Sequence, residues 1–148
     1  MTRINTDGRG RSKMADEYKI QSGLYYTKEH EWAKPLSDGT VEVGIDDYAQ
    51  AQLHEIVYVE LPKKDAEVVQ GKNISAVESV KAVSDMYAPV SGKIIAINEA
   101  LLDSPDKVNS DAYGLGWIAK IQPINLEADL ARLMDAEKYK QYLASLKH

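Results

Sequence analysis

Residues 76–92 read AVESVKAVSDMYAPVSG and place a single lysine, Lys81, between two short apolar segments. Gly71 lies ten residues before Lys81 and Gly92 eleven residues after it, so two strands of similar length converge on this lysine. The pattern is typical of a β-hairpin with Lys81 at a tight turn. A lysine in that place is ordinarily just solvated, because lysine is rarely buried. Its symmetric placement also suits a covalently attached swinging cofactor, which needs an exposed amine on a rigid support.

The chain on both sides of this hairpin, up to about Pro123, consists of short β-rich segments. Many are rich in β-branched or aromatic residues with partial alternation, and turns rich in Gly, Pro, Ser and Asp separate them. The predicted strands are Gly23–Tyr26, Glu31–Lys34, Thr40–Ile45, Glu55–Leu61, Asn73–Val80, Ala82–Ala88, Gly92–Asn98 and Gly116–Gln122. Strands at this spacing predict a mainly β fold, a small sandwich or barrel, rather than βαβ units.

Two stretches depart from the β pattern. Asp46 can cap a short internal helix over residues 47–53. From about residue 126 onward, the C-terminal segment shows two apolar stripes at helical spacing that point in nearly opposite directions. A single straight helix would expose one of them. We therefore predict two short C-terminal helices with a break near Asp135, whose side chain can cap the second helix.

Composition excludes several classes of function. The length of 148 residues suits one domain with one modest core. The net charge of −5 disfavours non-specific binding to nucleic acid or to anionic membranes, and no apolar run is long enough for a transmembrane helix. Cysteine is absent, which excludes disulfides, thiol catalysis and thiolate metal sites. Three histidines far apart in the sequence leave little for a metal centre, and we expect none.

The sequence matches common enzyme motifs only in part. The segment His30-Glu31-Trp32-Ala33-Lys34 begins like the H-E-x-x-H zinc motif but has lysine where the second ligand must stand. Gly114-Leu115-Gly116 lacks the third glycine of a dinucleotide-binding motif and predicts a tight turn instead. His54 follows the predicted internal helix, and we interpret it as interacting with the last carbonyls of that helix.

The N-terminal segment differs from the rest of the chain. Its first fifteen residues carry four basic side chains against one acidic side chain and show no apolar period. We expect residues 1–17 to be a disordered leader or expression segment, with Met14 as a native start, although a transit-peptide remnant is the alternative. We expect residues 18–148 to form a single domain, with C-terminal helices from about residue 126.

The whole chain resembles the H-protein family of the glycine cleavage system. The members of this family are lipoyl carriers related to the lipoyl and biotinyl domains. The resemblance runs from about Leu24 to Leu146 and is highly specific around Lys81. The matching segments are His30-Glu31-Trp32, Val43-Gly44-Ile45, Ile56-Val57-Tyr58-Val59-Glu60-Leu61-Pro62, Val77-Glu78-Ser79-Val80-Lys81-Ala82, Ser84-Asp85, Ala88-Pro89-Val90-Ser91-Gly92, Val108-Asn109-Ser110 and Gly116-Trp117. His54 is a departure, because the family usually has glycine at that place.

This resemblance implies a lipoyl/biotinyl-like barrel-sandwich hybrid that acts as a carrier and not as an enzyme. Lipoic acid, held as an amide on Lys81, would take the aminomethyl group from a pyridoxal-phosphate-dependent glycine decarboxylase (P protein). It would pass this group to a folate-dependent aminomethyltransferase (T protein) and be reoxidised by dihydrolipoyl dehydrogenase (L protein). A lipoate ligase or an octanoyl or lipoyl transferase would attach it. We expect a monomer with no nucleic-acid or membrane partner, cytoplasmic, or in the mitochondrial matrix if the source is eukaryotic.

Three acidic residues are candidates for a binding or recognition role beside the lipoyl arm. No residue of the chain is expected to be catalytic. Glu78 is expected to be recognised by the enzyme that modifies Lys81. Glu31 and Asp85 are candidates to hold the protonated amine of the loaded arm by a charge-assisted hydrogen bond in a partly dry cleft. Trp32 is expected to form an apolar wall of that cleft.

Related carriers fit the sequence less well. A biotin carrier normally has its lysine between two methionines, whereas Val80 and Ala82 flank Lys81 here. A lipoyl domain of an acyl dehydrogenase typically has D-K-A at the tip and belongs to a long multidomain chain. Two alternatives stay open: a lipoyl relay that donates its group to other enzymes, and an interaction module whose Lys81 is unmodified.

Overall fold

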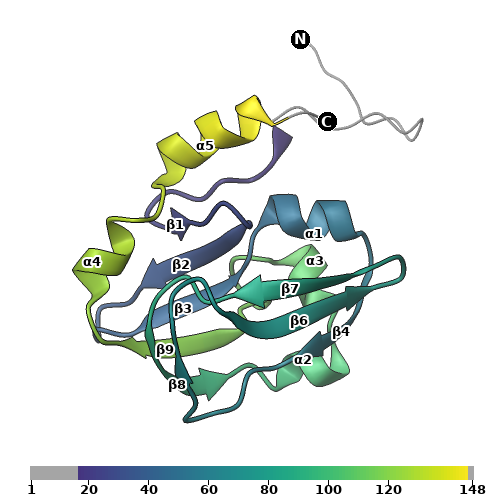
Figure 1. Cartoon of the computed structure of the whole chain (residues 1–148). Coiled ribbons are helices and arrows are strands. Elements are labelled where there is room, and N and C mark those ends of the chain that lie inside the picture. The colour runs from purple at the N-terminus through teal and green to yellow at the C-terminus, as the bar shows by residue number, and fades with distance from the viewer. Residues whose placement is uncertain (1–16, 147–148) are drawn as a thin grey trace.

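The computed structural model describes residues 17–146, so the leader expected over residues 1–17 lies outside the described residues except for Glu17. The chain forms two antiparallel sheets that face each other (Figure 1). The larger sheet has the strand order β1 (Tyr25–Tyr26), β2 (Glu31–Pro35), β3 (Val41–Ile45), β9 (Ala119–Pro123), β8 (Gly92–Ile97) and β5 (Glu67–Val68). The smaller sheet has the order β4 (Ile56–Glu60), β6 (Asn73–Ser79) and β7 (Val83–Tyr87). The predicted mainly β fold is confirmed, as two open sheets rather than a closed barrel.

Strands β6 and β7 form the predicted hairpin around Lys81. Strand β6 ends at Ser79 and β7 begins at Val83, which leaves residues 80–82 as the turn, and Glu78 pairs with Val83. The hairpin is held to the core by one face: Val77 and Met86 are buried, whereas Glu78, Val83 and Asp85 are exposed. This alternation follows from the period of two in a strand. In Figure 1 the turn of the hairpin lies on the right, and helix α4 (Leu126–Leu130) lies on the left.

The core between the sheets consists of aliphatic side chains from both. Its members are almost completely buried and include Val41, Val43, Ile56, Val59, Val77, Met86, Ile94, Ile118 and Ile121. Because most of these residues alternate with exposed or half-buried ones along their strands, each sheet buries one face. This packing fixes the hairpin that presents Lys81.

The internal helix is confirmed, and two further internal helices were not predicted. Helix α1 spans Asp47–Leu53, and the Asp46 carboxylate accepts a hydrogen bond from the Ala49 N–H at 2.9 Å. Helices α2 (Ala100–Asp103) and α3 (Lys107–Ser110) are one turn each, too short to show a helical period in the sequence. Within residues 17–146 no helix is long and apolar enough to cross a membrane.

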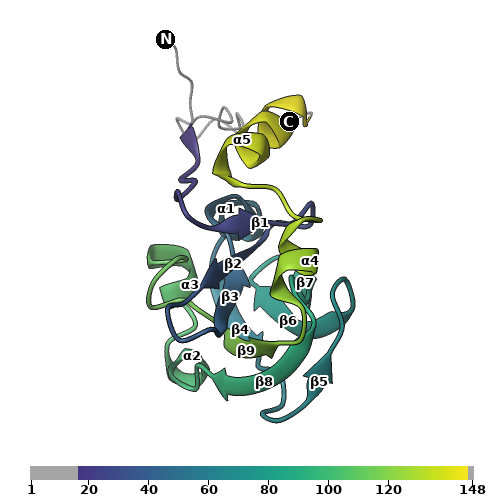
Figure 2. The ribbon, with the colours of Figure 1, turned by 90° about the vertical axis from the view of Figure 1, so that its left-hand side faces the viewer.

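The C-terminal segment breaks where the opposed apolar stripes predict. Helix α4 ends at Leu130, and helix α5 spans Ala136–Ser145. The Asp135 carboxylate caps α5 by accepting a hydrogen bond from the Lys138 N–H at 2.8 Å. Figure 2 shows the two helices on one side of the molecule, with α5 beyond the edge of the larger sheet at β1.

A buried polar cluster docks α5 against the larger sheet. The Tyr139 hydroxyl donates to the fully buried carboxylate of Asp46 and lies 2.7 Å from Nδ1 of His30. The Tyr139 ring stacks on Tyr26 with 4.4 Å between the centroids. Burial raises the pKa of Asp46 to about 8 and lowers the pKa of His30 to about 4. The docked helix holds the segment between α4 and α5 beside β1, where Met134 pairs with Tyr26.

The strand ends differ from the predicted ones at several places. Strand β9 begins at Ala119 and not at Gly116, because the Gly116 N–H closes a turn onto the Asp111 carbonyl at 2.9 Å. Strand β5 covers only Glu67–Val68 and was not predicted, since two residues show no alternation. Both differences lie outside the Lys81 hairpin.

His54 ends α1 in a backbone conformation that favours glycine. Its N–H donates to the Gln50 carbonyl at 2.9 Å, the backbone bond that closes the last turn of the helix. Its dihedral angles are φ 67° and ψ −147°, a region occupied almost only by glycine. We expect His54→Gly to raise the free energy of unfolding by about 1 kcal/mol in denaturant titrations. His54→Ala, which keeps a Cβ, is the matched control, and equal gains in the two variants would contradict the explanation.

Candidate functional site

The turn that carries Lys81 is fixed by a serine. Ser79 Oγ accepts hydrogen bonds from the backbone N–H groups of Lys81 at 3.2 Å and Ala82 at 3.1 Å. The Val80 N–H donates to the Glu55 carbonyl at 3.0 Å, which ties the turn to the start of β4. The Lys81 side chain is exposed, and no hydrogen bond or ion pair within the described residues engages its ammonium group. The structure therefore presents an exposed lysine side chain on an ordered turn.

A cavity of about 420 Å³ lies near the opposite end of β7 from Lys81. It is lined by the turn after β1, the turn before β6, the end of β7 and the segment between α4 and α5, including Thr27, Glu31, Gln70, Tyr87 and Arg132. Its volume falls in the usual range for a small-molecule pocket. From Lys81 to Tyr87 the chain advances six residues, or roughly 20 Å along an extended strand.

Glu31 is the buried carboxylate of this cavity and is only 1% exposed. One of its oxygens accepts a hydrogen bond from the Tyr87 N–H of β7 at 3.0 Å, and the other accepts one from the Thr27 hydroxyl. Burial raises the pKa of Glu31 to about 7, although both hydrogen bonds act in the opposite direction. Glu31 thus joins β2 to the Lys81 hairpin and offers the cavity a carboxyl group that titrates near neutral pH.

Because the Thr27 hydroxyl stabilises the charged form of Glu31, we expect Thr27→Val to raise the pKa of Glu31 further, by up to about one unit. The folded pKa already exceeds the unfolded value, so the folded state binds more protons and stability falls as pH rises from about 4.5 to 7. This fall should extend to higher pH in the variant. Titration of the Glu31 carboxyl carbon by NMR measures the shift. Thr40→Val, which removes a buried hydroxyl bonded to Asp38, is the control and should leave Glu31 unchanged.

The other predicted residues lie outside the cavity lining. Asp85 is exposed on β7, on the same outward face as Tyr87, and lies between Lys81 and the cavity. Glu78 is exposed on β6 directly opposite Val83. The prediction that Trp32 forms a wall of the cavity is wrong. Its ring is fully buried, and its Nε1 donates to the Ala112 carbonyl at 3.1 Å. It follows Glu31 on β2, so its side chain points to the opposite face and cannot form a wall of the cavity.

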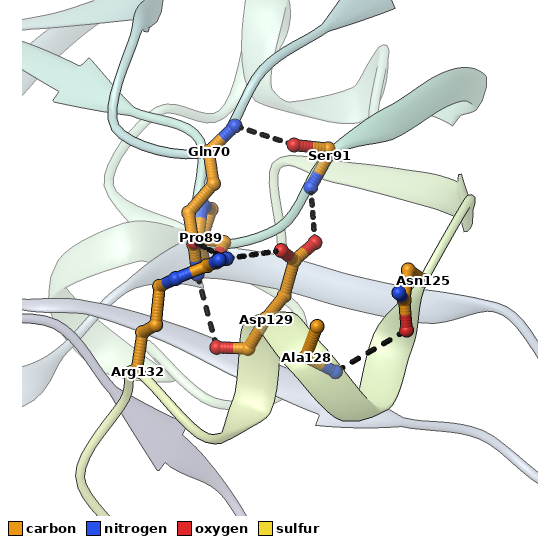
Figure 3. A network of polar contacts seen from close by, with 7 residues as sticks. All are labelled: Gln70, Pro89, Ser91, Asn125, Ala128, Asp129 and Arg132. Atoms are coloured by element: carbon orange, nitrogen blue, oxygen red, sulfur yellow. Dashed lines mark hydrogen bonds and ion pairs between the residues drawn. The ribbon is translucent and has the colours of Figure 1, made fainter.

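The segment after α4 that lines the cavity is held by a polar network around Asp129 of α4 (Figure 3). The nearly buried Asp129 carboxylate accepts hydrogen bonds from the Ser91 N–H at 2.8 Å and from Arg132 at 3.2 Å. The Gln70 amide donates to the Asp129 carbonyl at 3.0 Å and to the Pro89 carbonyl at 2.8 Å. Arg132 also donates to the Gln70 side-chain oxygen at 3.1 Å. These bonds join α4 to the turns before β6 and β8 and so fix the α4–α5 segment that lines the cavity.

The sequence analysis did not identify the residues that hold Lys81, Glu31 and the cavity segment in position. Ser79 was visible next to Lys81, and a serine that accepts from backbone N–H groups two and three residues later is a known turn signal. Tyr87 gave no signal, because its contact with Glu31 joins two sheets that only the fold brings together. Thr27 lies only four residues before Glu31, in the turn between β1 and β2, but its hydroxyl was not singled out. Asp129 in α4 and Arg132 just after it are only three residues apart, but their bonds to Ser91 and Gln70 depend on how α4 docks.

Comparison with known proteins agrees with this geometry. The family model described as glycine cleavage H-protein matches residues 24–146. A "Probable glycine cleavage system H protein" of Pyrococcus abyssi is 63% identical over 130 residues, which cover 88% of this chain and 96% of that protein. A "Glycine cleavage system H protein" of Coprothermobacter proteolyticus is 49% identical over 84% of this chain and 98% of its own.

A solved structure extends the similarity to the fold. The crystal structure of a glycine cleavage system H protein from Mycobacterium marinum superposes with a TM-score of 0.75 at 37% sequence identity. The match covers 83% of this chain and 98% of that chain. The chain therefore belongs to the glycine cleavage H-protein family, the lipoate-carrying and non-catalytic subunits of the glycine cleavage system.

Proposed function

We propose that this chain carries lipoic acid as an amide on Lys81. The observation that carries the proposal is the exposed ammonium group of Lys81, which has no ion-pair partner among residues 17–146, on a turn whose backbone is fixed by Ser79. A modifying enzyme can reach this amine, and the rigid hairpin lets the long arm swing from a defined point. The match to the H-protein family model spans this turn and supports the same assignment.

We infer that the cavity and its carboxylate receive the cargo at the end of the loaded arm. When bound, the lipoyl group supplies the sulfur that accepts and releases the aminomethyl cargo, because the chain has no thiol of its own. The amine of that cargo is protonated near neutral pH. Glu31 in its charged form would hold the ammonium group by a charge-assisted hydrogen bond, away from bulk water. Asp85, on the outward face of β7, would attract the same charge as the arm moves between Lys81 and the cavity.

The partners follow from this chemistry. The carrier would accept its cargo from the P protein, deliver it to the T protein and be reoxidised by the L protein, after a lipoate ligase or an octanoyl or lipoyl transferase has loaded Lys81. The relatives above are archaeal and bacterial proteins, which favours the cytoplasm over the mitochondrial matrix. We expect the carrier to work as a monomer.

The test is the mass of the full chain after expression in a host supplied with lipoate. The proposal expects the intact mass to rise by one lipoyl group and peptide mapping to place that group on Lys81. An unmodified Lys81 under these conditions would instead favour an interaction module. Transfer of the lipoyl group from the loaded chain to a second apo-acceptor, in the presence of a transferase, would identify the relay alternative, which can coexist with glycine cleavage.

A further inference from the structure

The outer face of the smaller sheet carries uncovered apolar side chains next to the Lys81 turn. Tyr58 of β4, Glu78 of β6 and Val83 of β7 lie directly opposite one another in the register of the three strands. Tyr58 is 47% exposed and Val83 is 62% exposed. Residues paired in this way point to the same face, so they form one continuous row across the sheet.

A β-bulge enlarges the apolar part of this face. The register of β4 against β6 shifts between Ile56 and Tyr58, so Val57 is an extra residue in β4. Ile56 and Val59 are buried, and both residues between them are therefore turned outward, with Val57 at 45% exposure. Bulges commonly re-aim side chains beside functional sites. Val80, in the Lys81 turn itself, is 64% exposed and extends the patch to the lysine.

The two rows of the sheet at this face carry charged side chains of one sign. In the next row of the sheet, Glu60 pairs with Ala76 and Ala76 pairs with Asp85. Together with Glu78, the two rows hold three exposed carboxylates and no basic side chain. A complementary surface would be apolar at its centre with lysine or arginine side chains around it. An exposed apolar patch with a polar rim is typical of a protein-binding site.

We propose that this face, formed by Val57, Tyr58, Glu78, Val80 and Val83 and called the hairpin face, is the docking surface for the enzyme that attaches the lipoyl group. The inference rests on the proposed modification of Lys81. In that reaction the neutral Nζ of Lys81 forms a bond with the carbonyl carbon of an activated lipoyl or octanoyl donor, the leaving group departs with its bonding electrons, and the amine proton passes to solvent.

The position of the hairpin face selects this enzyme among the partners. An enzyme that forms an amide on Nζ must come within one lysine side chain of the turn, and it then meets Val80 and Val83. Partners that act on the far end of the finished arm can bind at a greater distance from the turn. The acidic rim adds attraction for a basic partner, which raises the association rate.

The test compares two double variants of the full apo-chain. Tyr58→Thr/Val83→Thr removes apolar surface from the hairpin face and keeps residues that favour β-strands. Val69→Thr/Ile124→Thr is the matched control, because both side chains are large, apolar and exposed but lie away from the Lys81 turn. Initial rates of modification by a purified lipoate–protein ligase with lipoate and ATP are followed by intact mass, as a function of apo-chain concentration. Thermal unfolding shows that each variant is folded.

We expect the first double variant to raise KM for the apo-chain about tenfold, which corresponds to about 1.4 kcal/mol of docking energy, with kcat unchanged. The control should behave like the wild-type chain. Equal KM values for all three proteins, or equal increases in both variants, would overturn the hairpin face as a specific docking surface while leaving the lipoylation of Lys81 intact. A wild-type chain that the ligase does not modify at Lys81 would overturn the proposed function itself, so the two failures are distinguishable.

Discussion

Lys81→Arg is expected to fold like the wild-type chain, to carry no lipoyl group, and to reduce aminomethyl transfer between the P and T proteins to the level seen without carrier. Arginine keeps the positive charge on the exposed turn, but its guanidinium stays protonated and cannot act as the amine that forms the amide. The backbone bonds of the turn use Ser79 and main-chain groups, so they do not depend on this side chain. Intact mass measures loading, and circular dichroism measures the fold.

Lys72→Arg is the matched control for this substitution. Lys72 is also exposed and lies just before β6, at the other end of the strand that leads to Lys81. The control should be lipoylated and active as the wild-type chain is. A lipoyl group on a different lysine in Lys81→Arg, or transfer activity without any lipoyl group, would contradict the assignment of Lys81.

The Lys81 hairpin was predictable because the relevant information is local. The spacing of Gly71, Lys81 and Gly92 and the alternation on both sides of the lysine determine β6, the turn and β7 before any tertiary contact is considered. The break near Asp135 was predictable for a similar reason, since two opposed apolar stripes cannot both be buried by one straight helix. Helices α2 and α3 were not, because a single turn is stabilised by its tertiary surroundings rather than by its own period.

The candidate site was only half predictable. Glu31 was chosen through a family resemblance, and its burial beside a cavity agrees with that choice. Its partner Tyr87 could not be predicted, because Tyr87 lies 56 residues away in the sequence and contributes only its backbone N–H. The prediction for Trp32 was wrong for a simpler reason. Neighbouring residues on a strand face opposite sides, so Glu31 and Trp32 could not both line the same cavity.

Glu31→Gln is expected to leave folding and lipoylation unchanged and to accelerate the spontaneous loss of the aminomethyl group from the loaded chain. The cargo carries a protonated amine and can decompose to formaldehyde and ammonia in water, so its lifetime depends on how firmly it is held away from solvent. Glutamine keeps the shape of the side chain. Its carbonyl oxygen can still accept from the Tyr87 N–H and its amide group can donate to the Thr27 hydroxyl, but it cannot offset the ammonium charge. A hydrogen bond to a charged group contributes about 1.5–3 kcal/mol, which corresponds to roughly a tenfold to hundredfold faster decay.

The pH dependence of this decay separates charge from shape. Burial raises the pKa of Glu31 to about 7 in the empty cavity, and a seated ammonium group would lower it again. As pH falls through the pKa that Glu31 has with the cargo bound, the wild-type carboxyl becomes neutral. The ratio of the Glu31→Gln decay rate to the wild-type decay rate should then fall towards one. At higher pH the ratio should reach its full value. Glu67→Gln, on the exposed edge strand β5, is the control and should give a ratio of one throughout. If the loaded Glu31→Gln chain decays at the wild-type rate at every pH, Glu31 does not hold the cargo and its carboxylate serves only to join β2 to β7.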